Sequence, residues 1–539
     1  MRSERLLWHG VLAAGEEFPD RPACEIQRPL TYRELLDRAK RIAATIQRDG
    51  VNDAVPLTAV FGNHSETAYT GVLGTLMAGH GYVPLNRAFP LERTRLMLKR
   101  SMCRSLVVDR ESEGQLEPLL EQVEESLLIL CPDRDDVSDL ANRLRPHKIV
   151  GAADLAAEEQ WARKDVSPGS IAYLLFTSGS TGQPKAVMVS HANVLHYVDY
   201  VTRRYSISSR DRVSQNFDLT FDLSAHDLFV AWHKGACVCC ANKKQRFKPD
   251  DFIKRAGLTI WFSVPSTALF MQRLGVLKRG LYPSLRLSLF CGEALPSKIA
   301  SEWSMAAPNS VIENIYGPTE LTIACTAYRW DKNLSPRESE HGIVPIGEPF
   351  DDMEVLIADG SLQEVQDGTA GELLMRGPQM SAGYWQDEER TKRAFVAAPG
   401  KNGELFYRTG DRVCRRGAGR PLVYLGRVDS QIQVLGYRVE LGEVEWAVRR
   451  ASGLDGVVAI GWPLTERGAD GIEVFLEADS FDTASLVTQL RSKLPPYMVP
   501  RNVRFLTPLP RNSNGKCDRQ ALLTMLEKES EVGITISVS

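Results

Sequence analysis

Short apolar runs alternate with helical patterns through the first half of the chain. Runs such as Pro56–Phe61, Ser105–Val108 and Leu258–Val264 are dominated by leucine, isoleucine, valine and aromatic side chains. Buried parallel strands have continuous apolar runs of this kind because helices cover both faces of the sheet. The pattern therefore predicts α/β layers around a buried parallel sheet, to which Leu127–Leu130 and Leu285–Phe290 also belong.

A helix with a capping box is predicted near residue 30. In the segment LTYRELLDRAKRIAATIQR (residues 30–48), Thr31 precedes the helical periodicity and Glu34 follows three residues later. A threonine at this position accepts a hydrogen bond from the third helical N–H, and the glutamate accepts one from the threonine N–H. We therefore expect an amphipathic helix that begins directly after Thr31.

The pattern changes from about residue 340 onward. Glycine and proline become frequent in IGEPF, DGTAGELLMRGPQM and RTGD, which is typical of a twisted antiparallel or barrel-like subdomain. After Asp429 the order of predicted elements is a strand at Gln431–Val434, a capped helix that begins near Leu441, strands at Gly456–Gly461 and Gly471–Ala478, and a helix at Thr483–Lys493. This order predicts a small α+β domain at the C-terminal end.

The length of 539 residues supports a division into domains, because one hydrophobic core rarely serves more than a few hundred residues. We assign residues 1–428 to a large N-terminal core, residues 429–525 to a small mobile domain and residues 526–539 to a tail. The tail is expected to be loose from Glu527 to Ser539.

Composition narrows the class of protein. Hydrophobic residues make up 43% and charged residues 25%, which is ordinary for a globular protein, and no stretch is apolar enough to span a bilayer. The net charge of −3 gives a nucleic-acid partner no electrostatic support. The N-terminus has no apolar segment followed by a small-residue cleavage site, so we expect a cytosolic protein.

Three of the ten cysteines are clustered, Cys237, Cys239 and Cys240 in GACVCC. A metal site would need a second pair of ligands, and none is near in the sequence. The surrounding residues are small and apolar, so a buried strand is the better interpretation.

The sharpest local pattern is a loop rich in glycine and hydroxyl groups, within YLLFTSGSTGQPKAV (residues 173–187). Polyphosphate binding needs close backbone approach, hydroxyl and N–H donors, and a fixed cation. The candidates that supply these are Thr177, Ser178, Gly179, Ser180, Thr181, Gly182 and Lys185. The spacing differs from the G-x-x-x-x-G-K-[ST] pattern, and a flexible linker would not be flanked by an apolar strand and a Pro-Lys stop.

Further segments accompany this loop along the chain: MAGHGYVPLNRAFP (77–90), CGEALP (291–296), ENIYGPTE (313–320), YRTGD (407–411), YLGRVDSQIQVLGYRVELGEVE (424–445), LPPYMVP (494–500) and NSNGK (512–516). In this order they resemble the adenylate-forming superfamily of acyl- and aryl-CoA synthetases, luciferases and nonribosomal peptide synthetase adenylation domains. The resemblance runs from LTYRELL near residue 30 to NSNGKCDRQAL near residue 514. It implies an enzyme that activates a carboxylic acid with ATP as an acyl-adenylate and releases pyrophosphate.

The resemblance also implies roles for single residues. Tyr316 would stack on adenine with Asn314 near its amino edge, Thr319 would face the phosphates, Glu320 would hold Mg²⁺, and Asp411 would bind the ribose hydroxyls beside Tyr424 and Arg427. Lys516 would reach the substrate carboxylate and the α-phosphate, and would act with Glu320 and Lys185 as the catalytic set. Attack of the carboxylate spreads charge onto phosphate oxygens, so fixed cations and Mg²⁺ do most of the chemistry.

Asp429 matches the family's hinge position, about which the C-terminal domain rotates between adenylation and thioester formation. The chain departs from the family at Gln433 and Leu435, where Lys and Arg are usual. If that lysine assists the second half-reaction, thioester formation here is slow or depends on other contacts.

The segment FDLTFDLSAHDLF (residues 217–229) resembles the amino-acid-activating branch of the family. Asp222 matches the aspartate that pairs with the substrate α-ammonium. A buried carboxylate that faces a cation is the most direct way to select an amino acid over a fatty acid. Asp218 lies in a second Phe-Asp-Leu and is a rival for this role, although the spacing to His226 and Phe229 favours Asp222.

Alignment with the family implies a pocket lined by Leu223, His226, Ser263, Leu289, Cys291, Ile315, Ile323 and Ala324, with Lys516 at the substrate carboxylate. Among these eight lining residues, His226 is the one side chain that could carry a charge. It either bonds a polar side chain or fills space, and we favour space filling. We expect a small or medium neutral amino acid, with proline, serine and cysteine first and branched aliphatic residues next.

A carrier-protein motif of the G-G-x-S type does not follow Lys516 in the sequence, and few residues remain there. The resemblance therefore implies a free-standing enzyme that loads the phosphopantetheine thiol of a separate carrier protein, in nonribosomal peptide or related secondary-metabolite biosynthesis. The alternatives that stay open are a CoA ligase for a small carboxylic acid, a D-alanine:carrier-protein ligase, and a non-catalytic scaffold that keeps the fold.

Overall fold

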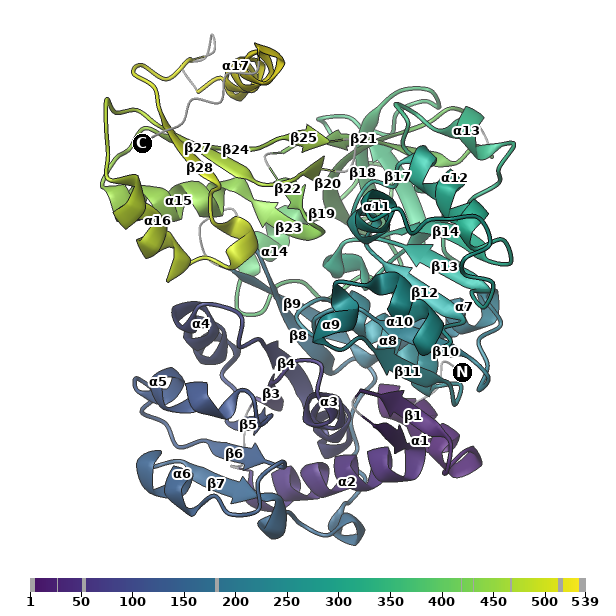
Figure 1. The fold of residues 1–539 in the computed structure, drawn as a ribbon, viewed down its shortest axis with the longest axis vertical. Coiled ribbons are helices and arrows are strands. Elements are labelled where there is room, and N and C mark those ends of the chain that lie inside the picture. Colours follow the sequence, from purple (N-terminus) through teal and green to yellow (C-terminus); the bar gives the residue numbers. More distant parts are fainter. Residues whose placement is uncertain are drawn as a thin grey trace. The chain divides into compact units, whose positions relative to one another are not determined.

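The computed structural model describes residues 5–26, 28–50, 55–179, 184–417, 419–429, 431–465, 468–511 and 517–532 (Figure 1). Contacts divide the chain into two compact units. The larger comprises Met1–Thr177 and Lys185–Asp429, and the smaller comprises Ser178–Pro184 and Ser430–Ser539. Each unit has its own sheets and hydrophobic clusters.

The first sheet of the large unit has the strand order β7-β6-β5-β3-β4-β8-β9. Its strands are β3 (Leu57–Phe61), β4 (Gly81–Leu85), β5 (Ser105–Val108), β6 (Leu128–Cys131), β7 (Lys148–Gly151), β8 (Ile171–Thr177) and β9 (Lys185–Ser190). Strands β3 to β8 run parallel, and β9 returns antiparallel to β8. The predicted strands of this region are confirmed, and β8 and β9 hold the two ends of the glycine-rich loop.

The second sheet has the order β16-β15-β14-β13-β12-β10-β11-β1-β2. Its strands are β1 (Pro22–Glu25), β2 (Pro29–Thr31), β10 (Arg212–Gln215), β11 (Cys237–Cys240), β12 (Ile260–Ser263), β13 (Leu287–Phe290), β14 (Val311–Tyr316), β15 (Thr326–Arg329) and β16 (Glu348–Pro349). The strands from β14 to β1 are parallel, whereas β2, β15 and β16 are antiparallel edges.

The cysteine cluster lies in β11, every residue of which is buried. This confirms that GACVCC is a buried strand. In the part of the chain that the structure describes, no group of three or more His, Cys, Asp or Glu side chains could hold a metal ion.

A third sheet is antiparallel, with the order β17-β18-β20-β19 and β21 also paired with β20. Its strands are β17 (Glu354–Ala358), β18 (Gly371–Arg376), β19 (Phe395–Ala397), β20 (Leu405–Arg415) and β21 (Leu422–Arg427). This is the antiparallel subdomain that the density of glycine and proline predicts. Its β20–β21 pairing sets Asp411 opposite Arg427.

Helices cover the two parallel sheets. They are α1 (Leu7–Glu17), α2 (Tyr32–Asp49), α3 (Glu66–Ala78), α4 (Leu91–Ser101), α5 (Leu116–Leu120), α6 (Ser138–Arg143), α7 (His191–Arg204), α8 (Leu223–Trp232), α9 (Lys243–Arg246), α10 (Pro249–Arg255), α11 (Pro265–Arg273), α12 (Ser297–Ala306), α13 (Ser335–Glu338) and α14 (Glu388–Ala394). The capping box of α2 is confirmed: the Thr31 N–H donates to the Glu34 carboxylate at 2.8 Å, and the Glu34 N–H donates to the Thr31 hydroxyl at 3.2 Å. Among the described helices, none is long and apolar enough to cross a membrane.

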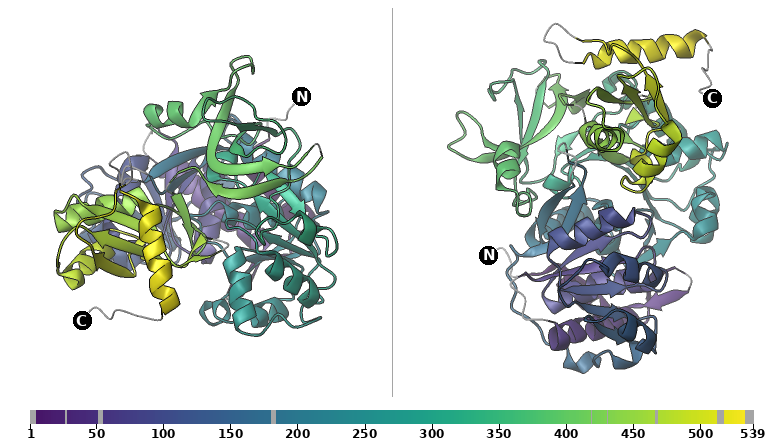
Figure 2. Two further views of the ribbon diagram at one scale, coloured as in Figure 1. Left: turned by 90° about the horizontal axis from the view of Figure 1, so that it is seen from above. Right: turned by 90° about the vertical axis from the view of Figure 1, so that its left-hand side faces the viewer.

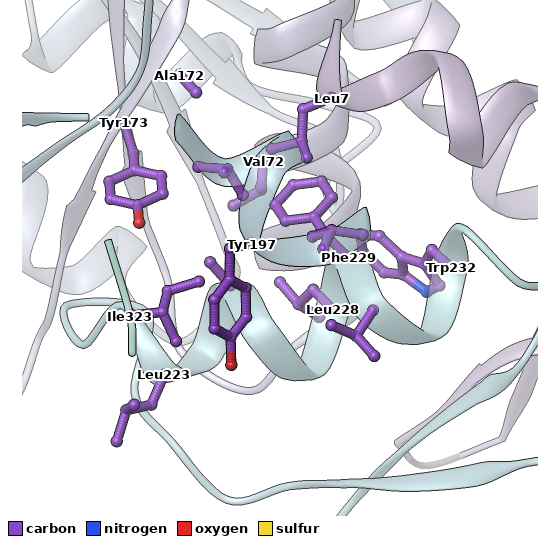
Figure 3. Packing of buried hydrophobic residues seen from close by; sticks show 14 of the residues in the cluster. Leu7, Val72, Ala172, Tyr173, Tyr197, Leu223, Leu228, Phe229, Trp232 and Ile323 are labelled. Carbon is purple, nitrogen blue, oxygen red and sulfur yellow. The ribbon is translucent and has the colours of Figure 1, made fainter. Parts of the chain in front are cut away.

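Helix α8 lies at the centre of the main core. All its residues are buried. Figure 3 shows Phe229 and Trp232 of α8 packed near Leu7 of α1 and Val72 of α3, and these side chains belong to one hydrophobic cluster. Helix α8 is therefore packed against the core along its whole length.

The small unit has the predicted α+β composition. One sheet contains β22 (Gln431–Val434), β23 (Tyr437–Glu440), β25 (Leu464–Thr465) and β26 (Gly468–Ala469), and another contains β24 (Val457–Gly461), β27 (Ile472–Leu476) and β28 (Asn502–Phe505). Its helices are α15 (Leu441–Ser452), α16 (Thr483–Arg491) and α17 (Arg519–Val532). The predicted cap of the helix at Leu441 is wrong, since the residue before α15 is Glu440 and its side chain makes no capping hydrogen bond.

The predicted tail is wrong for residues 526–532, because α17 continues through them to Val532 (Figure 2). Leu522 and Leu526 lie one turn apart and are buried with Ile460, Phe475 and Leu509. Apolar burial on one face therefore extends the helix. Residues 533–539 lie outside the described residues.

Candidate active site

The predicted pocket residues gather at the carboxyl ends of neighbouring parallel strands. Ser263 ends β12, Leu289 lies in β13 with Cys291 directly after it, Ile315 lies in β14, Leu223 and His226 lie in the first turns of α8, and Ile323 and Ala324 precede β15. All are buried, and the apolar ones belong to one cluster. Figure 3 shows Leu223 and Ile323 beside Tyr197. Ligands of α/β sheets bind at such strand ends.

Asp222 directly precedes α8, and only 8% of its surface is exposed. Its Oδ2 accepts a hydrogen bond from the Ile323 N–H at 3.2 Å, and the Thr319 side chain is a second hydrogen-bond partner. Burial raises the pKa of Asp222 to about 6, and the charge of Glu320 adds to this effect. Among the described residues, no lysine, arginine or histidine pairs with this carboxylate.

Asp218 is also buried, but both its oxygens are used within the protein. Its Oδ1 accepts hydrogen bonds from the Thr220 N–H at 2.8 Å and the Thr220 hydroxyl at 2.6 Å. Its Oδ2 accepts one from the side-chain amide of Asn86. Asp218 therefore ties the segment before α8 to the segment after β4, and the geometry favours Asp222 as the group that can meet a ligand.

The loop that faces Asp222 has an unusual backbone. Thr322 and Ile323 have φ values of 57° and 70°, although a β-branched residue rarely adopts positive φ. Gln379, which sequence reasoning missed, holds this loop: its buried side-chain amide donates to the carbonyls of Leu321, Thr322 and Ala324 at 3.2, 3.2 and 2.7 Å. The Ile323 N–H is thus kept in position for Asp222.

A buried cation lies at the start of β9. The Lys185 Nζ is 2.8 Å from the Glu320 carboxylate and 3.2 Å from the Tyr384 hydroxyl, which itself donates to Glu320 at 2.7 Å. Strand pairing sets Lys185 opposite Thr177. Within the described residues, the buried Thr177 hydroxyl has no hydrogen-bond partner. Sequence reasoning missed Tyr384, whose only local signal is its place after the glycine of SAGYW.

A second polar group lies on β20 and β21. The Tyr316 hydroxyl donates to one oxygen of Asp411, and the Arg427 guanidinium lies 2.7 Å from the other. Arg427 also binds the Asp429 carboxylate through two nitrogens, both at 2.7 Å. Tyr424 lies on the same strand pair, and burial raises the pKa of its hydroxyl. The structure thus brings these predicted nucleotide-site residues together.

Asn314 has backbone partners of its own. Its side-chain amide donates to the carbonyls of Val344 and Pro345 at 3.3 and 2.9 Å. The amide nitrogen therefore joins β14 to the segment before β16, and only the side-chain oxygen is left for a further contact.

Other predicted residues lie in or near the small unit. The Ser178 hydroxyl donates to the Arg438 carbonyl at 2.7 Å, and the Gly179 N–H donates to the Glu443 carboxylate at 3.1 Å. Asp429, the exposed last residue of the large unit, is the predicted hinge. Ser180, Thr181, Gly182 and Lys516 lie outside the described residues.

The two departures from the family pattern are also described. Leu435 is 46% exposed and has a φ of 51°, and the buried side-chain oxygen of Gln433 has no hydrogen-bond partner among the described residues.

A surface depression of about 580 Å³ contains none of these candidates. It is lined by His196, Asp199, Tyr200, Arg203, Asp351 and Asp352. Ion pairs link several of its walls, for example Arg203 with Asp351 at 2.6 Å. The clustered polar groups at the strand ends, rather than this depression, define the candidate site.

These features define an adenylate-forming enzyme. The profile of the family described as AMP-binding enzyme matches residues 12–385, and the chain belongs to this family. The D-alanine–D-alanyl carrier protein ligase of Bacillus licheniformis is 29% identical over 506 residues, which are 92% of this chain and 94% of that protein. Tyrocidine synthase 3 of Brevibacillus parabrevis is 32% identical over 505 residues, but the chain covers only 7% of it.

Solved structures support the same assignment. The Vibrio cholerae adenylation domain AlmE in complex with glycyl-adenosine-5'-phosphate superimposes with a TM-score of 0.87 and is 32% identical, covering 97% of this chain and 98% of that one. The structure of IdnL7 gives a TM-score of 0.72 with 36% identity and covers 98% and 99%. The predicted superfamily, the α/β fold with its large N-terminal and smaller C-terminal domains, and the assignment as a ligase are confirmed.

Proposed function

We propose that this ligase activates a small or medium neutral amino acid with ATP, as aminoacyl-AMP, and then loads it onto the phosphopantetheine thiol of a separate carrier protein. Asp222 is the observation that carries this proposal. A carboxylate with no cationic partner among the described residues, yet buried at the strand ends, is costly unless a ligand supplies the cation. The α-ammonium of an amino acid has the right charge and hydrogen-bond donors.

The names of similar proteins support an amino acid and a carrier. One relative is a D-alanyl carrier protein ligase, and AlmE was solved with a glycyl adenylate. Both names pair an amino acid with this fold, and the first also names a carrier protein. The carrier, its free-standing nature and a role in nonribosomal peptide biosynthesis are part of the proposal. A cytosolic location stays a prediction.

The nucleotide is proposed to bind at the polar group on β20 and β21. Asp411 would accept hydrogen bonds from the ribose hydroxyls, since an ionised carboxylate can accept two at once. Arg427 already fixes this carboxylate, and Tyr316 and Tyr424 supply aromatic surface for adenine. The oxygen of Asn314 remains available to the adenine amino group.

The phosphates are proposed to lie near Lys185. Thr177 offers a hydroxyl opposite it, and Ser178, Gly179, Ser180, Thr181 and Gly182 complete the loop. Glu320 fits a Mg²⁺ ligand, because it is a buried oxygen donor and nucleotide sites often hold this ion through one or two carboxylates together with the phosphates. When bound, Mg²⁺ neutralises charge on the phosphates. Thr319, whose side chain bonds Asp222 in the ligand-free protein, is proposed to face the phosphates once the nucleotide binds.

Lys516 is proposed to hold the substrate carboxylate against the α-phosphate during in-line attack. Pyrophosphate leaves, and developing charge is offset by Lys516 and Lys185. We propose a hinge at Asp429, between a core of residues 1–428 and a mobile domain of residues 429–525, so that rotation exposes the adenylate to the carrier thiol.

The experiment that tests this proposal is amino-acid-dependent ATP–pyrophosphate exchange. The panel contains the twenty proteinogenic amino acids, D-alanine, acetate, benzoate and a medium-chain fatty acid. Exchange with a small neutral amino acid is the expected result. Exchange with a simple acid alone would retain the adenylate chemistry but contradict the amino-acid assignment and support a CoA ligase. Retained ATP binding without any exchange would support the non-catalytic scaffold.

D-alanine:carrier-protein ligase is a second candidate. It is favoured by the B. licheniformis relative, which matches this chain over 94% of its own length. A kcat/KM for D-alanine well above that of every L-amino acid and of glycine would support it. An L-amino acid as the best substrate would exclude it.

A further inference from the structure

The imidazole of His226 has one nitrogen whose hydrogen bonding is incomplete. The side chain is buried, with 1% exposure. Its Nδ1 lies 2.7 Å from the Tyr197 hydroxyl, whereas Nε2 has no partner in the described part of the chain. The ring is also fixed by Phe262, which meets it edge to face with 4.5 Å between centroids. A rigid, buried polar atom without a partner calls for an explanation, and a missing ligand group supplies one.

The hydrogen-bond network indicates which proton His226 carries. If Tyr197 donates to Nδ1, the imidazole proton is on Nε2 and only that donor is left over. If Nδ1 donates instead, both the phenolic proton and the Nε2 lone pair are left over. Each buried unsatisfied group lowers stability, so the first arrangement, which leaves fewer of them, is favoured.

The imidazole is therefore a neutral hydrogen-bond donor. Burial lowers the pKa of His226 to about 3, so it carries no charge at physiological pH. A neutral Nε2–H calls for an acceptor and offers nothing to an ammonium. It supplies no countercharge for a buried carboxylate, so a neutral oxygen is the acceptor that fits it best.

The spacing of His226 and Asp222 along α8 relates the Nε2–H donor to the side chain of a bound substrate. Asp222 has helical dihedral angles, φ −65° and ψ −18°, and His226 lies four residues further along α8. Side chains at this spacing lie on one face of a helix with roughly 5–6 Å between their Cβ atoms. Phe262 holds the ring from β12, next to the pocket residue Ser263. A substrate whose ammonium meets Asp222 would extend its side chain toward His226.

We propose that His226 donates a hydrogen bond from Nε2 to a neutral oxygen on the substrate side chain, and that the enzyme thereby selects a hydroxyl-bearing amino acid, serine first. This inference rests on the proposed function. Proline, alanine and branched aliphatic side chains would leave the donor buried and unpaired, and the thiol of cysteine is a weak acceptor. In this role His226 discriminates polar from apolar substrate side chains and does more than fill space.

The test compares kcat/KM for serine, alanine, cysteine and proline in pyrophosphate exchange, with the full-length enzyme and its variants. The wild type should favour serine over alanine by about tenfold or more, the equivalent of one hydrogen bond. His226→Phe should bring the serine-to-alanine ratio close to one. Tyr197→Phe should also lower the ratio, because Nδ1 loses the donor that places the proton on Nε2.

Tyr200→Phe is the matched control for Tyr197→Phe. It removes a phenol hydroxyl from the same helix, α7, but at the surface depression and not beside His226. Its serine-to-alanine ratio should equal that of the wild type. A wild-type preference for alanine, proline or a branched aliphatic residue over serine would overturn the inference, as would an unchanged ratio in His226→Phe. If His226→Phe is inactive with every amino acid, the wild-type ratio and that of Tyr197→Phe decide.

Failure of the proposed function gives a different result. If no amino acid supports exchange, the amino-acid assignment itself fails. If amino acids support exchange but serine has no advantage over alanine, only the role of His226 fails. Preference for threonine or asparagine would support the hydrogen bond, since both carry a neutral oxygen.

Discussion

Replacing Asp222 by asparagine keeps the shape of the side chain and removes its charge. The folded protein raises the pKa of Asp222 from 3.8 to about 6. A raised folded pKa means that the stability contributed by the neutral carboxyl is present below pH 3.8 and is lost as the pH rises through about 6. A shift of about two units corresponds to roughly 3 kcal/mol.

The ligand-free variant should therefore be more stable than the wild type at pH 8, by up to about 3 kcal/mol, and nearly equal to it at pH 4. The same substitution should weaken amino-acid activation. Loss of a charge-assisted hydrogen bond to the ammonium removes roughly 2–4 kcal/mol of transition-state binding, or about 30-fold or more in kcat/KM. The gain in stability and the loss in activity have one cause, the buried charge.

Urea denaturation at pH 4 and pH 8, together with pyrophosphate exchange, measures both effects. Asp218→Asn is the control. The new side-chain NH₂ group would face the N–H donors of Thr220 or Asn86, which need an acceptor, so the urea midpoint at pH 8 should fall. A lower urea midpoint for Asp222→Asn at pH 8 would refute the argument from burial. Unchanged amino-acid turnover would show that another group holds the ammonium.

Three further predictions concern the machinery around this charge. Lys516→Ala should reduce pyrophosphate exchange by about 10²–10³-fold while ATP binding, measured by calorimetry, is mostly retained; undiminished exchange would contradict the role of this lysine. Gln379→Leu should lower the free energy of unfolding by about 1–3 kcal/mol and raise the amino-acid KM, because the loop before β15 loses its donor; a stability equal to that of the wild type in urea would argue against the clamp. Leu526→Ala should destabilise the small unit by about 2–4 kcal/mol in urea, whereas a loose tail would tolerate the change.

The sequence predicts the fold class well because its signals are local. The capping box at Thr31, the buried strand of GACVCC and the apolar strands before the glycine-rich loop need only neighbouring residues to be recognised. The end of the chain is misjudged because the burial of Leu526 depends on Phe475 and Leu509, residues that a pattern of charges and small side chains does not reveal.

The residues of the candidate site can be predicted only where they lie in a recognisable sequence motif. Asp218 and Asp222 both lie in Phe-Asp-Leu, and their local sequence does not separate them; the contacts of Asn86 and Ile323 do. Tyr384 is 199 positions from Lys185, with which it shares Glu320. Long-range partners of this kind exist only after folding, so sequence spacing cannot supply them.

Departures from good folding chemistry are concentrated at the beginning of α8 and the loop that faces it. Asp222 is a buried charge without a cationic partner among the described residues, His226 has an unpaired donor there, and Ile323 has a φ of 70°. Each of these three features lowers the stability of the ligand-free protein. Such features persist where ligand binding compensates for them. The two polar groups would bind different ligand groups: Asp222 would bind a cation, and His226, one helical turn away, would bind a neutral hydrogen-bond acceptor. An unsubstituted fatty or aryl acid offers neither group, whereas an amino acid with a short hydroxylated side chain carries both. If the proposed roles hold, these two groups restrict the substrate more tightly than the apolar residues around them do.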